Sequence, residues 1–277
     1  MTQGYQSIFH LLSKIPSNLW THRELTGHLS SREISQRYRN SYLGILWSLI
    51  TPMTLLAIYT FVFSTVFQSR WRSDQPATTG EFALILFAGL AAFNVFSEVS
   101  NRAPMIILNN PNYVKRVVFP LEIWPVVLLN SALVNSLIAC GLIVSGQVLL
   151  NWKVSATLLL LPLAYVPLVL LTLGVGWFLA SLGVYVRDIG QGIGLAIQIL
   201  FFLSPVFYPI SAVPSQVADI LQANPLTFIL TMFRQILLWG EIPDWRIWIM
   251  WSVLGLLFAV SGYLWFMKTK KGFADVL

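Results

Sequence analysis

The sequence predicts an all-α membrane protein with six transmembrane helices. Of its 277 residues, 56% are hydrophobic and only 10% are charged, and the mean hydropathy is +0.72. A soluble domain has about 25% charged residues, so this chain carries more apolar surface than polar groups could cover, and the surplus must face lipid. Six apolar stretches reach the length of about 20 residues that crosses a bilayer. The apolar–polar alternation of a membrane β-barrel is missing from the sequence.

The six predicted spans are separated by polar or proline-containing segments. They cover Leu43–Phe67, Phe82–Ser100, Leu121–Leu150, Ser155–Val186, Ile193–Ile210 and Trp245–Met267. A further apolar piece of about 15 residues, Pro225–Trp239, lies between the last two spans and is too short to cross the bilayer. A re-entrant or interfacial helix fits this piece better.

The segment Pro209–Trp239 is predicted to form an external hairpin of two short helices. In the second helix Asn224 is the expected N-cap, Pro225 lies in the first turn and Gly240 closes the helix as C-cap. Such a hairpin either narrows an exit on the outer side of the membrane or covers the surface without gating it.

A helix is predicted to begin at Ser30, ahead of the first span. Ser30 and Glu33 have the S-x-x-E spacing of a capping box, in which each side chain satisfies a free backbone N–H. Apolar and polar residues then fall on opposite sides of the helix, so it is expected to lie in the membrane interface. The apolar side holds Ile34, Tyr38, Ser41, Tyr42 and Ile45, and the polar side holds Arg32, Gln36, Arg39 and Asn40. The helix is either an anchor or a contact for a soluble partner.

The loop between the second and third spans is predicted to contain one short helix. Asn110 can cap it, Pro111 suits its first position and Pro120 ends it. The loop is basic and aromatic, which fits a knob that enters a cleft in another protein. The alternative is a charged turn that only sets topology.

The distribution of basic residues predicts that both termini are cytoplasmic. If the six spans alternate, 12 of the 17 Lys and Arg residues fall on the inner side. The net charge of +6 and the pI near 9.6 are therefore assigned to loops held against the cytoplasmic leaflet, and no nucleic-acid partner is predicted.

The sequence lacks the residues that several other functions would require. No stretch matches G-x-x-x-x-G-K-[ST], so the chain is not expected to hydrolyse ATP. Glu98 and Arg102 are spaced to pair with each other, and other ionisable residues are scarce within the spans, which disfavours an ion-coupled carrier. No catalytic residue, metal site or cofactor is predicted in the chain itself, because the three histidines precede the first span without metal-ligand spacing. Cys140 is expected to be a small buried hydrophobic residue.

Aromatic residues are frequent within the predicted first and fifth spans. Aromatic rings stack on the C–H faces of sugars, so rings along a path would let a polysaccharide slide. The candidates are Tyr59, Phe63, Phe67, Phe201, Phe202, Phe207 and Tyr208. The alternative is that the rings face lipid or form an interfacial belt. The small pairs Gly190/Gly194 and Gly176/Ala180 predict close helix packing.

Five stretches in the same order resemble the polysaccharide-export permeases of the ABC-2 class of ATP-binding-cassette transporters, over nearly the whole chain. They are Arg37–Trp47 followed by Pro52, Val118–Pro120 with Glu122, Arg187–Ile189 ahead of a Gln-Ile-Leu-Phe-Phe run, Ser204–Pro209, and Asn224–Leu226 leading to Arg234. The resemblance implies a homodimer of six-span subunits with a channel between them. It also implies two copies of a separate ATPase subunit, which bind ATP and Mg²⁺.

The resemblance further implies a role for each segment. Residues 1–42 form a cytoplasmic N-terminal segment with an interface helix, 43–267 the transmembrane domain and 268–277 a cytoplasmic tail. The interface helix and a coupling helix in the second loop contact the ATPase through Arg32, Arg37, Arg39, Tyr113, Lys115, Arg116 and Phe119. The first and fifth spans line the channel, and the external hairpin forms its outer gate with Asn224, Pro225, Phe228 and Phe233.

By the same resemblance, the leading hypothesis is export of an undecaprenyl-linked polysaccharide, with O-antigen first, across the bacterial inner membrane. Capsular polysaccharide or teichoic acid is the alternative substrate. Two other classes remain: a membrane-embedded enzyme of glycan assembly, for which Asp219, Glu241 and Asp244 are too scattered, and an ATP-independent carrier.

Overall fold

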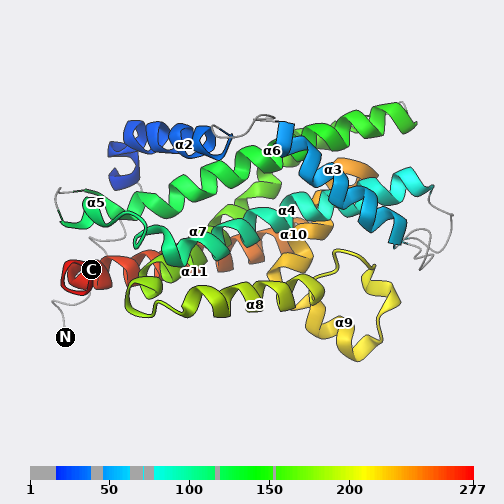
Figure 1. Cartoon of the computed structure of the whole chain (residues 1–277). Helices are drawn as coiled ribbons and strands as arrows, with labels where there is room; N and C mark the ends of the chain where they lie inside the picture. Colours follow the sequence, from blue (N-terminus) through cyan, green and yellow to red (C-terminus); the bar gives the residue numbers. More distant parts are fainter. Residues whose placement is uncertain (1–16, 39–45, 63–70, 72–77, 116–118, 152–153) are drawn as a thin grey trace.

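The computed structural model describes residues 17–38, 46–62, 71, 78–115, 119–151 and 154–277, and within them every regular element is helical. In this part of the chain four helical segments are long and apolar enough to cross a membrane. They contain the helices α4 (Thr79–Ile106), α6 (Trp124–Asn151), α7 (Leu161–Tyr185) and α11 (Trp245–Thr269), which lie side by side in Figure 1. The prediction of an all-α membrane protein is confirmed.

Two of the six predicted spans correspond to shorter helices. The helices α3 (Trp47–Thr60) and α8 (Ile189–Phe202) have 14 residues each, or about 21 Å of helix, which is less than the bilayer core of about 30 Å. The end of the predicted first span, at residues 63–67, lies outside the described residues. The fifth prediction was wrong beyond Phe202, because the chain leaves the helix and Pro205 and Pro209 cannot donate helical hydrogen bonds.

α4 forms the centre of the bundle. It contacts α3, α6, α7, α8 and α10 (Pro225–Arg234), and most of its residues are buried. Its first turn carries a capping box, in which Thr78 accepts a hydrogen bond from the Glu81 N–H (3.3 Å) and the Glu81 carboxylate accepts one from the Thr78 N–H (2.9 Å). The cap fixes where the most enclosed helix begins.

The helices α7 and α11 cross at close range. A Cβ atom on Gly262 would lie 2.2 Å from the Gly174 carbonyl oxygen, so a side chain there would push the two helices apart. The predicted packing at Gly176 is confirmed, since a Cβ there would lie 3.1 Å from Val99. Close packing at Gly190 and Gly194 was wrong within the described chain, where the nearest atoms would be 3.9 and 3.8 Å away.

Large apolar surfaces remain exposed on three helices. On α3 they include Trp47, Met53, Ile58 and Phe61, on α8 Leu195, Ile199 and Phe202, and on α11 Ile249, Val253, Leu257 and Phe258. Surfaces of this extent are not found on soluble monomers. They are suited to lipid or to another subunit.

The predicted start of the N-terminal helix at Ser30 was wrong. The helix α2 (Arg23–Tyr38) begins earlier and lies along α6. The Ser30 hydroxyl is buried and accepts a hydrogen bond from the Asn130 amide of α6 (3.1 Å), while Glu33 pairs with Arg102 of α4. The side chains of Ser30 and Glu33 therefore attach α2 to the bundle and do not cap a helix.

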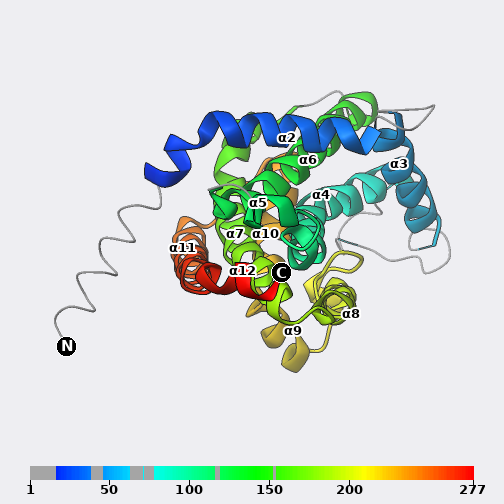
Figure 2. The same cartoon turned by 60° about the vertical axis from the view of Figure 1, so that its left-hand side comes forward.

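The short elements gather at opposite ends of the bundle. The helices α5 (Pro111–Lys115) and α12 (Phe273–Val276) lie at one end, next to the C-terminus, and α9 (Ser215–Gln222) lies at the other (Figures 1 and 2). The loop between the second and third spans and the predicted external hairpin are therefore on different sides of the molecule.

Candidate functional site

The described channel-lining candidates form one cluster, in which α3 packs against the loop that follows α8. The ring of Phe207 lies 5.0 Å from Tyr59 and 4.9 Å from Phe201. Phe202 is 5.7 Å from Phe201, and its carbonyl accepts a hydrogen bond from the Tyr208 hydroxyl (2.8 Å). The other two candidates, Phe63 and Phe67, lie outside the described residues.

The cluster has an exposed side and a packed side. Phe202 is 59% exposed, whereas Phe207 is 4% exposed. The buried ring of Phe93 on α4, which the sequence interpretation missed, lies 5.0 Å from Phe201 and closes the cluster from behind. Phe207 and Phe93 therefore support the rings that a sliding chain could touch.

The hairpin confirms the predicted helix ends. The Asn224 side-chain oxygen accepts from the Leu226 N–H (3.0 Å), Pro225 is the first residue of α10, and Gly240 has a positive φ of 67° after the π-helical turn η6 (Gln235–Trp239). Phe233 is fully buried with its ring 5.0 Å from Tyr165 of α7. Among the gate candidates, Phe233 thus anchors the hairpin, and Phe228 is half-buried.

Arg234, at the end of α10, is the main feature that the sequence interpretation missed. The alternation of the six predicted spans placed it on the outer side of the membrane, yet its side chain is 1% exposed. Its Nε donates to the Ile85 carbonyl (3.1 Å) and its two terminal nitrogens donate to the Pro205 and Val206 carbonyls (2.8 and 2.9 Å). These bonds tie α10 to α4 and to the loop after α8. A signal was available, because Arg234 is the one charged residue in the otherwise largely apolar stretch Pro225–Trp239.

Two further residues complete the Arg234 site. The guanidinium carbon lies 4.3 Å from the centre of the Trp71 ring, which is a cation–π contact. A Cβ on Gly89 would come within 2.4 Å of a guanidinium nitrogen, so only glycine leaves room at this position of α4.

The α5 end of the bundle is held by aromatic contacts. Tyr113 lies 4.6 Å from Phe119 and 5.6 Å from Trp124, measured between ring centres. Pro111 begins α5 as predicted, whereas the Asn110 amide donates to the Ile106 carbonyl at the end of α4 (2.9 Å). Of the other coupling candidates, Arg32 is exposed on α2. Arg39, Arg116 and the side chains of Arg37 and Lys115 lie outside the described residues.

A buried carboxylate at the same end joins distant parts of the chain. Glu122 is 3% exposed, and it accepts from Lys270 (2.6 Å) and from the Asn18 amide (2.7 Å). The Trp177 indole donates to the Glu122 carbonyl (2.9 Å). Phe273 in the predicted C-terminal tail is fully buried, so this tail is packed into the bundle.

A polar network links α2 to the bundle interior. The predicted pair of Arg102 and Glu98 is confirmed (3.3 Å), and Arg102 also pairs with Glu33 of α2. The second oxygen of Glu98 accepts from the Asn135 amide of α6 (3.3 Å). A displacement of α2 would therefore act directly on α4 and α6.

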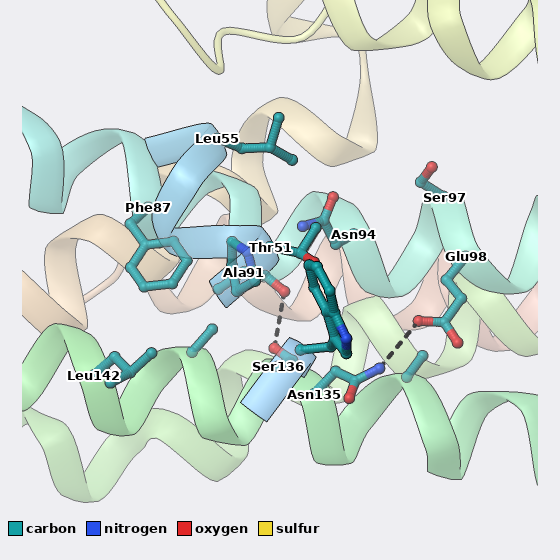
Figure 3. A pocket seen from close by; sticks show the side chains of 14 residues that line it. Thr51, Leu55, Phe87, Ala91, Asn94, Ser97, Glu98, Asn135, Ser136 and Leu142 are labelled. Carbon is teal, nitrogen blue, oxygen red and sulfur yellow. Dashed lines mark hydrogen bonds between the residues drawn. The ribbon is translucent and has the colours of Figure 1, made fainter. Parts of the chain in front are cut away.

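The network borders a cavity of about 530 Å³ between α3, α4 and α6 (Figure 3). Its walls are formed by Trp47, Thr51, Pro52, Leu55, Phe87, Ala91, Asn94, Ser97, Glu98, Ala132, Asn135, Ser136, Ala139 and Leu142. Within the part of the chain that the structure describes, no three His, Cys, Asp or Glu side chains gather to hold a metal ion.

The family profile and the similar proteins agree on one family. The profile of the ABC-2 type transporter family matches residues 24–238. The O-antigen export system permease protein RfbA of Klebsiella pneumoniae is 24% identical over 265 residues, which cover 95% of this chain and 99% of that protein. RfbA of Myxococcus xanthus is 26% identical, with 83% and 86% covered, and the polysialic acid transport protein KpsM of Escherichia coli is 26% identical, with 77% and 81% covered. Because the family profile matches well over half of its length, this chain belongs to the ABC-2 type transporter family.

Proposed function

We propose that this chain is the membrane subunit of an ATP-driven exporter that moves undecaprenyl-linked O-antigen across the bacterial inner membrane. The observation that carries the proposal is the end-to-end similarity to O-antigen export permeases, which covers 95% of the chain and 99% of the relative. The relatives are transport subunits, and this chain is assigned no catalytic step of its own.

The proposed pathway lies between two copies of the chain. The exposed apolar faces of α3 and α8 both flank α4 and suit a symmetric contact with a second copy. The aromatic cluster of Tyr59, Phe201, Phe202 and Tyr208 joins α3 to the end of α8 and the loop after it, so its exposed rings would border the channel. The hairpin of α9 and α10 would close its outer end.

The proposed ATPase contact lies at the end of the bundle that holds α5. Two copies of a separate ATPase subunit would bind ATP and Mg²⁺ and contact α2 and α5 from the cytoplasm. Movement of α2 would reach α4 and α6 through the Glu33–Arg102–Glu98 network, and change the spacing of the two subunits.

The proposed topology has six crossings and two cytoplasmic termini. Four crossings would be made by the long helices α4, α6, α7 and α11. The other two would be made by α3 and α8, each extended by its flanking residues. The helix pair α10–η6 would be re-entrant, which is compatible with its burial against α4 and α7.

Capsular polysaccharide is the second candidate substrate. It is favoured by the polysialic acid transport proteins among the relatives, at 26% identity.

Two measurements test the proposed function. Deletion of this chain should leave one lipid-linked glycan in the cytoplasmic leaflet, and its sugar composition separates O-antigen from capsule. The full chain should co-purify with a P-loop ATPase. Transport by the purified chain without an ATPase would overturn the proposal.

A further inference from the structure

The cavity between α3, α4 and α6 lies at a depth where polar groups are costly. Asn94 is near the middle of α4, and Asn135 and Ser136 are near the middle of α6. Because both helices are long enough to span the bilayer, these groups lie far from both membrane surfaces. Polar side chains at such depth usually serve a binding or transport function.

The cavity has an apolar end and a polar end. Figure 3 shows Phe87 and Leu142 at one end, and Ser97 and Glu98 at the other. Small side chains line α6 where larger ones would fill the space, at Ala132 and Ala139. A cavity that changes from apolar to polar along its length suits an amphiphilic ligand, with an alkyl chain at one end and a polar headgroup at the other.

The polar end favours an uncharged headgroup. Neither Lys nor Arg is among the 14 lining residues, so nothing in the wall would neutralise a phosphate. The carboxylate of Glu98 would repel an anion, and it is already paired with Arg102 (3.3 Å), which reduces its attraction for a cation. The ligand that matches this wall is neutral.

The remaining wall groups are those that bind hydroxyls and sugar rings. Within the described chain the exposed Asn94 amide forms no hydrogen bond, so it can both donate to and accept from a ligand. Thr51 and Ser97 add hydroxyls, and the half-exposed indole of Trp47 offers a flat apolar face. The volume of about 530 Å³ is within the range of small-molecule sites.

We propose that this cavity binds an amphiphile with an uncharged glycosyl headgroup, with the sugar beside Asn94, Glu98 and Trp47 and the alkyl chain toward Phe87. The site goes beyond the proposed function, because none of the predicted channel-lining residues is in its wall. All of its lining residues belong to one copy of the chain, so binding needs neither ATP nor a partner subunit.

The proposal is tested by photolabelling the full chain in membranes without ATP. The probe is a decyl maltoside with a diazirine in its alkyl chain, and the comparison probe is the matching decyl phosphocholine. The maltoside should label peptides of α3, α4 or α6 at least about fivefold more strongly than the phosphocholine, and excess unlabelled decyl maltoside should remove the signal.

Variants locate the site. Asn94→Leu should lower this labelling about tenfold, because it removes a donor and an acceptor for the headgroup. Ser145→Leu is the control, since this exposed hydroxyl on α6 lies outside the cavity and donates to the Gly141 carbonyl of its own helix (2.8 Å), and it should leave the labelling unchanged. Ala139→Leu places a larger side chain in the cavity from α6, and it should abolish the labelling by the maltoside probe.

Equal labelling by the two probes, or labelling that Asn94→Leu and Ala139→Leu both leave intact, would overturn the glycosyl site. Export plays no part in this measurement, so loss of the site and loss of the proposed function are separate outcomes.

Discussion

The guanidinium of Arg234 is held inside apolar helices by carbonyl oxygens in place of a carboxylate. A guanidinium is charged under all physiological conditions, and its burial is costly unless its donors are satisfied. Three carbonyls and the Trp71 ring supply this compensation. Among the described residues it thereby holds α10 against α4 without an ion pair.

Replacement of this residue should destabilise the fold. Arg234→Met leaves three carbonyl oxygens without their donors, and we expect a loss of about 3 kcal/mol in unfolding free energy, at roughly 1 kcal/mol for each. The measurement is thermal or denaturant unfolding in detergent. Arg246→Met, at an exposed Arg at the start of α11, is the control and should change stability little. Equal stability of the two variants would contradict the role assigned to Arg234.

The aromatic cluster permits a test that separates export from folding. Tyr59→Ala should slow glycan export several-fold with a small effect on stability, because this ring is half-exposed. Phe207→Ala removes a buried ring and should cost about 3–5 kcal/mol of stability. Glycan export in intact cells and unfolding of the purified protein are the two measurements. Unaltered export by Tyr59→Ala would assign that ring to lipid contact.

At the scale of elements, α2 is fastened to the bundle by polar contacts. Its buried face includes Thr26, Leu29 and Ser30, and Glu33 reaches Arg102 on α4. A helix held in this way can transmit a displacement to α4 more directly than one that only rests in the membrane interface.

Glu33→Gln tests this connection. The change removes the charge that pairs with Arg102, so export should fall several-fold while the ATPase still co-purifies. Glu24→Gln is the control on the same helix, since the Glu24 side chain is 84% exposed and contacts Arg23 at 3.9 Å. Export and co-purification are measured for both variants. If the two variants export equally, the network does not carry the displacement.

The sequence predicted the long helices better than their ends and contacts. α4, α6, α7 and α11 are recognisable because their apolar runs exceed the length that a soluble helix needs. The capping-box spacing occurs both at Ser30 and at Thr78, and only the second site caps a helix. What decides between them is the packing of Ser30 against Asn130, a contact between residues 100 positions apart.

In the candidate site too, the sequence predicted the residue types better than their contacts. The aromatic candidates of α3 and α8 were predicted from composition, and the structure brings the described ones together. The burial of Arg234 depends on Ile85 and Pro205, which are distant in sequence, so no local pattern specifies these contacts. Local patterns thus predict which side chains are unusual, and the fold decides which of them meet.

For the whole molecule, the opposite ends of the bundle differ in the side chains that they hold. The end with α5 and α12 holds basic residues and the aromatic contacts of Tyr113, whereas the other end holds the hairpin anchored by Arg234. This polarity fits a subunit driven from one side of a membrane and gated on the other.

Charge reversal at the α5 end should weaken the association with the ATPase. Replacing Lys115 and Arg116 with Glu should reduce co-purification of the ATPase at least about tenfold, since it replaces attraction with repulsion at the contact. Arg246→Glu, at the start of α11, serves as the control and should co-purify normally. Membrane insertion of all variants is checked by fractionation. Unchanged co-purification of the double variant would remove α5 from the contact.

The Glu122 contacts have a consequence for biosynthesis. Asn18 is among the first described residues to leave the ribosome and Lys270 is among the last, yet both bind the same carboxylate. The end of the bundle that holds Glu122 is therefore finished only when translation is almost complete. A nascent chain that stalls before residue 270 would leave this buried carboxylate without its lysine partner, so the two ends of the polypeptide could not yet be joined there.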